Sequence, residues 1–98
     1  MFNVRWTDEA ELDLENILSY YLEHTGSHVA EAIYLRIKTQ VGSLKMFPER
    51  CRSGRVPGTH EYVISRLPYI AVVDISTDTV SILNIIHTAR KYPPDNSQ

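Results

Sequence analysis

The stretch that decides the fold is residues 61–87, EYVISRLPYIAVVDISTDTVSILNIIH. β-branched, aromatic and other apolar residues dominate it, and two breaks divide it, at Pro68 and at residues 76–78. This pattern predicts three strands, over residues 61–66, 69–75 and 79–87. Because short turns join antiparallel neighbours, the strands should form a meander. The almost wholly apolar 69–75 should be its central strand, covered on both faces.

Two helices are predicted before the meander. The first begins after Thr7, a good N-cap residue, and the second ends before Pro48. Gly26 and Ser27 lie between them as a helix stop and a new N-cap, so the helices should form an antiparallel hairpin. One apolar stripe runs along each helix: Ala10, Leu14, Ile17, Leu18 and Tyr21 on the first, and Ala30, Ile33, Ile37, Val41 and Leu44 on the second.

The remaining segments complete the expected fold. Residues 2–6 predict a short N-terminal strand, and residues 46–59, rich in proline and glycine, predict a loop. The expected fold is therefore an α+β domain, with an N-terminal strand and an antiparallel helical hairpin packed on a small antiparallel sheet that ends in a three-stranded meander. With 98 residues and no linker or repeat, the chain should be a single domain over residues 1–98.

The composition excludes several kinds of site and location. Cys51 is the one cysteine, which excludes an internal disulfide and a cysteine-based zinc site. The four histidines lack the spacing of metal ligands, so we expect neither a metal nor a cofactor. The longest apolar run, residues 69–73, is far shorter than the ~20 residues of a membrane span. No leader-like segment opens the sequence, and we therefore expect a cytoplasmic protein without membrane contact.

Charge is unevenly distributed, although the net charge is only −2. Residues 8–23 carry six acidic residues and no lysine or arginine, so the molecule should have an acidic side and a basic side. Without an overall basic excess, we do not expect the chain alone to bind DNA in a sequence-specific way. The basic residues expected to bind a partner are Arg50, Arg52, Arg55, Arg66, Arg90 and Lys91.

Three further residues stand apart from these patterns. Leu12 and Leu35 lie off the apolar stripes of their helices, where they are either ordinary surface leucines or partner contacts. Cys51 has arginines on both sides in the sequence, which would lower the pKa of its thiol. No catalytic cysteine motif surrounds it, so it is interpreted as an ordinary loop thiol.

His87, Arg90 and Tyr92 follow one another at the end of the last predicted strand. Such a set can cleave RNA, with a base, an acid and an arginine that stabilises charge on the phosphorus. Judged by spacing alone, a purely structural role for these three residues is favoured over a catalytic one. In it, His87 bonds a loop, Arg90 pairs with Asp74 or Asp95, and Tyr92 packs over the sheet edge.

Four short segments, in this order, resemble a known family. They are VRWT at residues 4–7, RVPG at 55–58, LPYI at 67–70 and IIHTARKYP at 85–93. The chain resembles the RelE/ParE toxin superfamily of type II toxin–antitoxin modules, and is most similar to the ParE branch. The likeness runs from about residue 3 to residue 93, and it implies a helical hairpin on a small antiparallel sheet.

The resemblance implies a growth-inhibiting toxin that a cognate antitoxin neutralises. RelE-type members cut mRNA in the ribosome with basic strand residues and a terminal Arg and Tyr, whereas ParE-type members are gyrase poisons. The positions of the basic strand residues correspond here to Val63, Ser65 and Ile70, and only Arg90 and Tyr92 match the terminal pair. The resemblance thus favours a gyrase poison; an mRNA endonuclease and an antitoxin-binding module without toxicity remain the alternatives.

The resemblance also implies an antitoxin segment that wraps the domain and folds on contact. Acidic residues of that segment would suit the basic residues named above, and its apolar anchors would use Leu12 or Leu35. Replacing both Arg52 and Arg55 with glutamate is then expected to weaken or slow antitoxin association.

Overall fold

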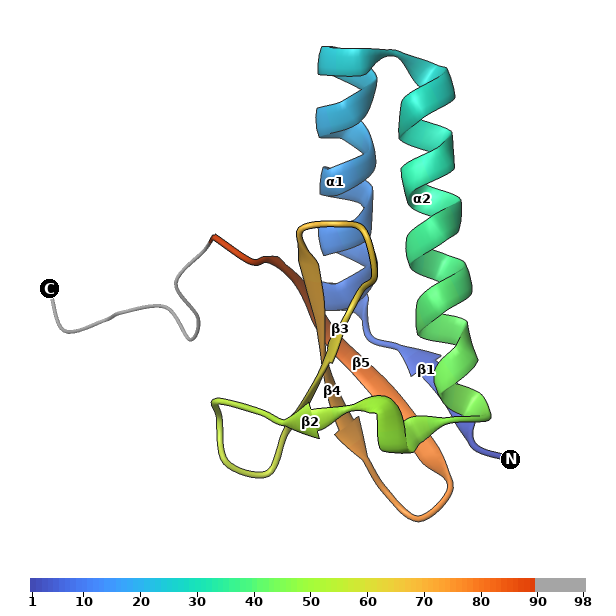
Figure 1. Ribbon diagram of the computed structural model, residues 1–98, viewed down its shortest axis with the longest axis vertical. Coiled ribbons are helices and arrows are strands. Elements are labelled where there is room, and N and C mark those ends of the chain that lie inside the picture. The colour runs from blue at the N-terminus through green and yellow to red at the C-terminus, as the bar shows by residue number, and fades with distance from the viewer. Residues whose placement is uncertain (90–98) are drawn as a thin grey trace, which may run out of the picture.

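The computed structural model describes residues 1–89, which form one mixed sheet and a helical hairpin (Figure 1). The sheet has five strands in the order β1-β5-β4-β3-β2. Its strands are β1 (Asn3–Trp6), β2 (Arg52–Ser53), β3 (His60–Val63), β4 (Tyr69–Ile75) and β5 (Thr79–His87). The α+β class and the meander of β3, β4 and β5 are confirmed, and the two longest strands have the predicted bounds.

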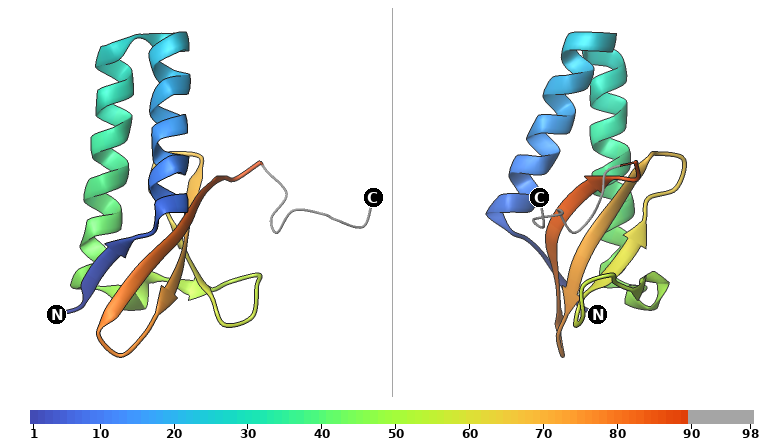
Figure 2. Two further views of the ribbon diagram at one scale, coloured as in Figure 1. Left: turned by 180° about the vertical axis from the view of Figure 1, so that it is seen from behind. Right: turned by 90° about the vertical axis from the view of Figure 1, so that its left-hand side faces the viewer.

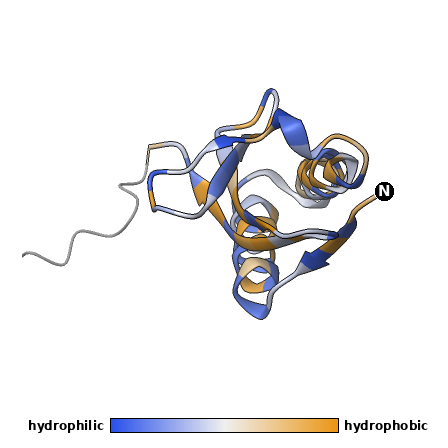
Figure 3. Ribbon diagram, turned by 90° about the horizontal axis from the view of Figure 1, so that it is seen from below, coloured by the Kyte–Doolittle hydropathy of each residue, from blue (hydrophilic) through white to orange (hydrophobic). Residues whose placement is uncertain are grey.

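The helices are α1 (Asp8–Thr25) and α2 (Ser27–Gly42), which run antiparallel and extend beyond one end of the sheet (Figures 1 and 2). Thr7 caps α1 as predicted, because its Oγ1 accepts a hydrogen bond from the Ala10 N–H at 3.2 Å. Gly26, with φ of 93°, joins the helices, so α2 starts at Ser27 without the predicted serine cap. Both helices alternate hydrophobic and hydrophilic bands, as amphipathic helices do (Figure 3).

The main core lies between the hairpin and one face of the sheet. Most residues of the predicted helical stripes belong to it, together with side chains of the strands, and Tyr21 and Ile33 are only partly buried. A smaller cluster, made of Ile70, Val72 and Ile86, is buried on the opposite face. β4 is therefore covered on both faces, as its apolar sequence predicts. The members of the main core with no measurable exposure are Ala10, Ile37, Val41, Leu44, Ala71, Val73, Val80 and Ile82.

The prediction that the whole sheet is antiparallel is wrong. β1 pairs with β5 in parallel, with Asn3 opposite Thr79 and Trp6 opposite Ile82. β1 reaches β5 only through the long connection that holds both helices, and the direction of such a pair is not set by a local turn. The turn residues in the sequence predict how the meander strands pair, but they do not indicate the direction in which β1 pairs with β5.

The segment predicted as a loop contains short regular elements. It holds a 3-10 turn over Pro48–Arg50 and the strand β2, which pairs with the start of β3. The second helix ends at Gly42, earlier than predicted, and a 3-10 turn over Ser43–Lys45 follows it. β3 also ends before the predicted residue 66, because Gln40 of α2 binds the following turn. Its Oε1 accepts the Ser65 N–H at 2.7 Å, and its Nε2 donates to the Ser65 carbonyl at 3.0 Å. No helix within residues 1–89 is long and apolar enough to cross a membrane.

Candidate functional site

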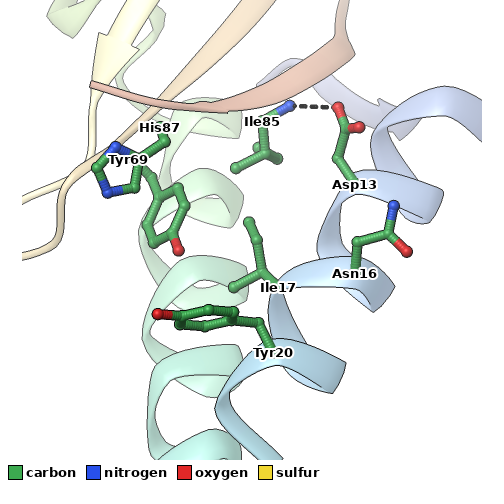
Figure 4. Close-up of a pocket in the computed structure, with 7 residues that line it drawn as sticks. All are labelled: Asp13, Asn16, Ile17, Tyr20, Tyr69, Ile85 and His87. Atoms are coloured by element: carbon green, nitrogen blue, oxygen red, sulfur yellow. Dashed lines mark hydrogen bonds between the residues drawn. The ribbon is translucent and has the colours of Figure 1, made fainter. Parts of the chain in front are cut away.

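A pocket opens where α1 passes the start of β4 and the end of β5 (Figure 4). Its volume is about 190 Å³, and we call it the α1–β5 pocket. The carboxylate of Asp13 and the amide of Asn16 lie on one side, and Tyr20, Tyr69 and His87 lie on the other. A second hollow adjoins it, lined by Tyr20, Tyr21, Tyr69, His87 and Ala89. The apolar floor between the two sides is formed by Ile17 and Ile85.

The acidic side of the pocket is fixed by hydrogen bonds to β5. β1 pairs only with residues 79–82 of β5, and α1 covers the remaining edge of that strand. Thr7 Oγ1 donates to the Ile82 carbonyl at 2.7 Å. Asp13 Oδ2 accepts the Ile85 N–H at 2.9 Å and the Asn84 side-chain amide at 3.2 Å. Asp13 therefore holds α1 to the sheet and has a defined orientation in the pocket.

The opposite side of the pocket is aromatic. Tyr69 is buried, and its hydroxyl lies 3.5 Å from that of Tyr21. The rings of Tyr69 and His87 meet edge to face, with their centroids 5.3 Å apart. Burial, together with the Tyr21 hydrogen bond, raises the pKa of Tyr69 well above its usual value. The Tyr69 hydroxyl thus stays protonated even at alkaline pH, and it donates its hydrogen bond to Tyr21.

His87 is the one member of the predicted RNA-cleaving set within the described residues. Its side chain is exposed, and its Nδ1 accepts the Ala89 N–H at 3.0 Å, which places the proton of the neutral ring on Nε2. This is the loop hydrogen bond of the structural alternative. Arg90 and Tyr92 lie outside the described residues, as does Lys91, and so does any pairing of Arg90 with Asp74 or Asp95.

Arg52 and Arg55 do not form a simple exposed basic patch. Both guanidinium groups pair with Glu61, whose side chain is 1% exposed, at 3.3 Å from Arg52 Nη2 and 3.4 Å from Arg55 Nε. The Arg55 backbone N–H also donates to Glu61 Oε2 at 3.0 Å. The arginine side chains remain 58% and 41% exposed, so each can contact a partner while it compensates the charge of Glu61.

The other predicted partner-binding residues of the described chain are exposed. Arg50 stacks on the ring of Phe47 at 4.5 Å, and Arg66 lies in the turn after β3 with a φ of 66°. Leu12 on α1 is 56% exposed and Leu35 on α2 is 54% exposed, which confirms that both lie outside the core. Their role as partner contacts stays a prediction.

The arginines that flank Cys51 in the sequence do not lower the pKa of its thiol. Burial raises the pKa of the Cys51 thiol from 9.0 to about 11. Cys51 packs against the main core, and this desolvation disfavours the thiolate. The neighbouring arginines do not offset it, since Arg52 pairs with Glu61 and Arg50 stacks on Phe47.

We expect Cys51 to react with iodoacetamide at pH 8 roughly 10- to 100-fold more slowly than the unfolded chain, because the reactive thiolate becomes about tenfold scarcer for each unit that the pKa rises. The rate should increase as pH rises toward 11, and the loss of the thiol proton should make the fold less stable over the same range. Mass spectrometry of the native and urea-unfolded chain measures both rates, with Cys51→Ser as the unreactive control. Equal native and unfolded rates would contradict this interpretation.

The sequence around Asp13 indicates its role, whereas the sequence around Glu61 does not. Asp13 lies three residues after Ala10 and four before Ile17, on the side of α1 that faces the core. An acidic residue at that position indicates a specific hydrogen-bond partner. Glu61 follows a basic segment and lies within β3, but no local pattern indicates that two arginines enclose it.

Within residues 1–89, no group of three or more His, Cys, Asp or Glu side chains is placed so that it could hold a metal ion.

Comparison with known proteins places this fold and these segments in one family. The model of the ParE toxin of type II toxin–antitoxin systems, parDE, matches residues 4–92. A putative toxin, Y4kP, of Sinorhizobium fredii (strain NBRC 101917 / NGR234) is 36% identical over 90 residues, which cover 92% of each chain.

Solved structures of toxin–antitoxin systems have the same fold as this chain. A chain of the chromosomal ParDE toxin–antitoxin system from P. aeruginosa is 27% identical, with a TM-score of 0.83 over 89% of this chain and 96% of that one. A chain of the RelBE2 toxin–antitoxin complex from Mycobacterium tuberculosis shares the fold, with a TM-score of 0.59 at 23% identity over 88% and 96% of the two chains. The chain belongs to the ParE toxin family, within the RelE/ParE superfamily of type II toxin–antitoxin systems.

Proposed function

We propose that this member of the ParE toxin family stops growth, when it is free of its antitoxin, by poisoning DNA gyrase and not by cutting RNA. The observation that carries the proposal is the absence of lysine and arginine from β3, β4 and β5. Val63 is 48% exposed and Ser65 is exposed, while Ile70 is buried. A cation aimed at a developing negative charge contributes about 3–4 kcal/mol by analogy with oxyanion-hole donors, and these strands supply none.

Electrostatics around the sheet supports the same choice. Arg52 and Arg55, beside β3, are paired with Glu61, and α1 presents carboxylates and no lysine or arginine. Docking on ribosomal RNA depends on a basic surface that neutralises phosphates. A chain with a net charge of −2 is better suited to a protein target.

The proposal includes a cognate antitoxin that inhibits the toxin by covering part of its surface. Exposed leucines on both helices offer apolar contacts, and arginines around β2 and β3 offer contacts for acidic side chains. The Arg52→Glu/Arg55→Glu variant is a poor test of this surface, because it would place three carboxylates together and impair folding and binding alike. The proposed antitoxin contacts among the described residues are Leu12, Leu35, Arg50, Arg52, Arg55 and Arg66.

The second candidate is a ribosome-dependent mRNA endonuclease. One observation favours it: His87 is exposed beside Tyr69 at the end of β5, and Arg90 and Tyr92 follow in the sequence. In this hypothesis His87 transfers a proton and Arg90 stabilises the phosphorane charge. The acidic Asp13 in the same pocket opposes it, because a carboxylate repels a phosphate.

Induction of the chain without antitoxin tests the proposal. We expect a DNA damage response with intact transcripts within minutes, followed by filamentous cells, and we expect Arg90→Ala to leave transcripts unchanged. Early transcript cleavage that Arg90→Ala abolishes would establish the endonuclease instead. Normal growth at a verified protein level would show that this chain is not toxic, and would support the antitoxin-binding module without toxicity.

A further inference from the structure

The α1–β5 pocket combines features that fit one kind of side chain. We infer that it receives an arginine side chain of the antitoxin, an inference that rests on the proposed antitoxin partner. Asp13 supplies a negative charge, Tyr20 and Tyr69 supply aromatic rings, and Ile17 and Ile85 supply an apolar floor. Among residues 1–89, none that line the pocket is a lysine or an arginine. A guanidinium with its alkyl stem can use all three surfaces at once.

The carboxylate of Asp13 retains capacity for a further donor. Both of its hydrogen bonds to β5 end on Oδ2, which leaves Oδ1 for a group in the pocket. No lysine or arginine lies on α1, whose acidic residues add a negative potential along this side of the molecule. A phosphate or a carboxylate would be repelled here, and a purely apolar anchor would desolvate Asp13 without compensation.

The aromatic side distinguishes arginine from other cations. Tyr20 is 54% exposed, and because His24 stacks on its ring with the centroids 4.3 Å apart, only the other face of the ring is open to a ligand. Tyr69 closes the pocket from the sheet. A planar guanidinium stacks on such rings with a cation–π attraction and can bond a carboxylate edge at the same time. A lysine ammonium gains the charge interaction but not the planar stacking.

The size and place of the pocket favour a flexible segment. The space beside Asp13, about 190 Å³, suits one side chain, and the adjoining hollow of about 500 Å³, which shares Tyr20, Tyr69 and His87, leaves room for the segment that carries it. A segment that folds on contact can insert a single side chain between a helix and a sheet. Such a segment would carry an arginine for this pocket and acidic residues for Arg52 and Arg55.

A titration followed by NMR tests the pocket itself. N-acetyl-arginine amide is added to the ¹⁵N-labelled full chain, with N-acetyl-citrulline amide as the neutral control of nearly equal shape. We expect saturable shifts at the backbone amides of Asn16, Tyr20, Ile85 and His87, with citrulline at least tenfold weaker. The titration is repeated with Arg90→Gln/Lys91→Gln, so that cations of the chain itself cannot compete.

A matched pair of variants then assigns the charge. Asp13→Asn keeps an oxygen that accepts the Ile85 N–H but removes the charge, and we expect it to weaken arginine binding at least fivefold and antitoxin binding about tenfold. Glu15→Gln, an exposed carboxylate of α1 outside this pocket, should leave both unchanged.

Three outcomes would overturn the inference: equal shifts with citrulline, no shifts in either chain, or antitoxin affinity that Asp13→Asn leaves unchanged. Uridine monophosphate, added as a further probe, should not shift these amides; if it does so in place of arginine, the pocket binds nucleotides. Neither titration involves gyrase. A pocket that does not bind arginine can therefore be distinguished from a toxin that does not inhibit gyrase.

Discussion

Replacing Arg52 and Arg55 together with alanine is expected to lower the free energy of unfolding by about 3–5 kcal/mol. Glu61 is almost fully buried, and these two guanidinium groups compensate its charge. Either arginine alone is about half exposed to solvent, so we expect each single substitution to cost about 1 kcal/mol or less. The double variant should therefore lose more than the sum of the two single variants, because only it leaves a buried carboxylate without a cation.

Urea unfolding, followed by circular dichroism, measures this loss. Arg50→Ala is the matched control, because Arg50 only stacks on an exposed ring and should change stability by less than about 1 kcal/mol. Adding Glu61→Gln to the double variant should restore most of the stability, since the glutamine oxygen can still accept the backbone N–H of residue 55 and the side chain carries no charge. A double variant that loses less than 1 kcal/mol, or that Glu61→Gln fails to rescue, would show that the pairs do not support the fold.

Neighbouring apolar residues on the helices should separate folding from partner binding. Leu14→Ala and Ile37→Ala are each expected to cost about 2–5 kcal/mol, because these side chains are 3% and 0% exposed in the main core. Leu12→Ala and Leu35→Ala, two residues away in each helix, should stay within about 0.5 kcal/mol of the parent. Each of these two substitutions should instead weaken antitoxin binding about tenfold, or by about 1.4 kcal/mol.

Unfolding curves and titration calorimetry with the cognate antitoxin compare the four variants under the same conditions. Each buried leucine or isoleucine serves as the control for the exposed leucine on its own helix. Antitoxin affinities that Leu12→Ala and Leu35→Ala both leave unchanged would make these residues ordinary surface leucines. A large loss of stability in either exposed variant would contradict the packing of the hairpin.

The elements that depend only on residues close together in the sequence were predictable. β4 and β5 are apolar runs between clear turns, and Thr7 caps α1 through its own hydroxyl, so their positions follow from neighbouring residues. The parallel pairing of β1 with β5 depends on a connection of about 70 residues, whose direction no short pattern sets. The early end of β3 depends on Gln40, a residue of another element.

The same division applies to the candidate sites. Leu12 and Leu35 were identifiable as exposed because helical periodicity alone places them off the core. The partners of Arg52 and Arg55 were not, because Glu61 lies on a neighbouring strand and only the β2–β3 register brings it between them. The pocket beside Asp13 likewise needs α1, β4 and β5 to be assembled before its residues have neighbours.

A gyrase assay with purified components tests the central claim most directly. Toxin, DNA gyrase, ATP and relaxed plasmid are incubated with and without the cognate antitoxin, and supercoiling and detergent-trapped cleaved DNA are scored on gels. The account predicts that the toxin inhibits supercoiling and accumulates cleaved plasmid, and that antitoxin prevents both. Unimpaired supercoiling without trapped cleavage, alongside mRNA cut by the same preparation on translating ribosomes, would contradict it.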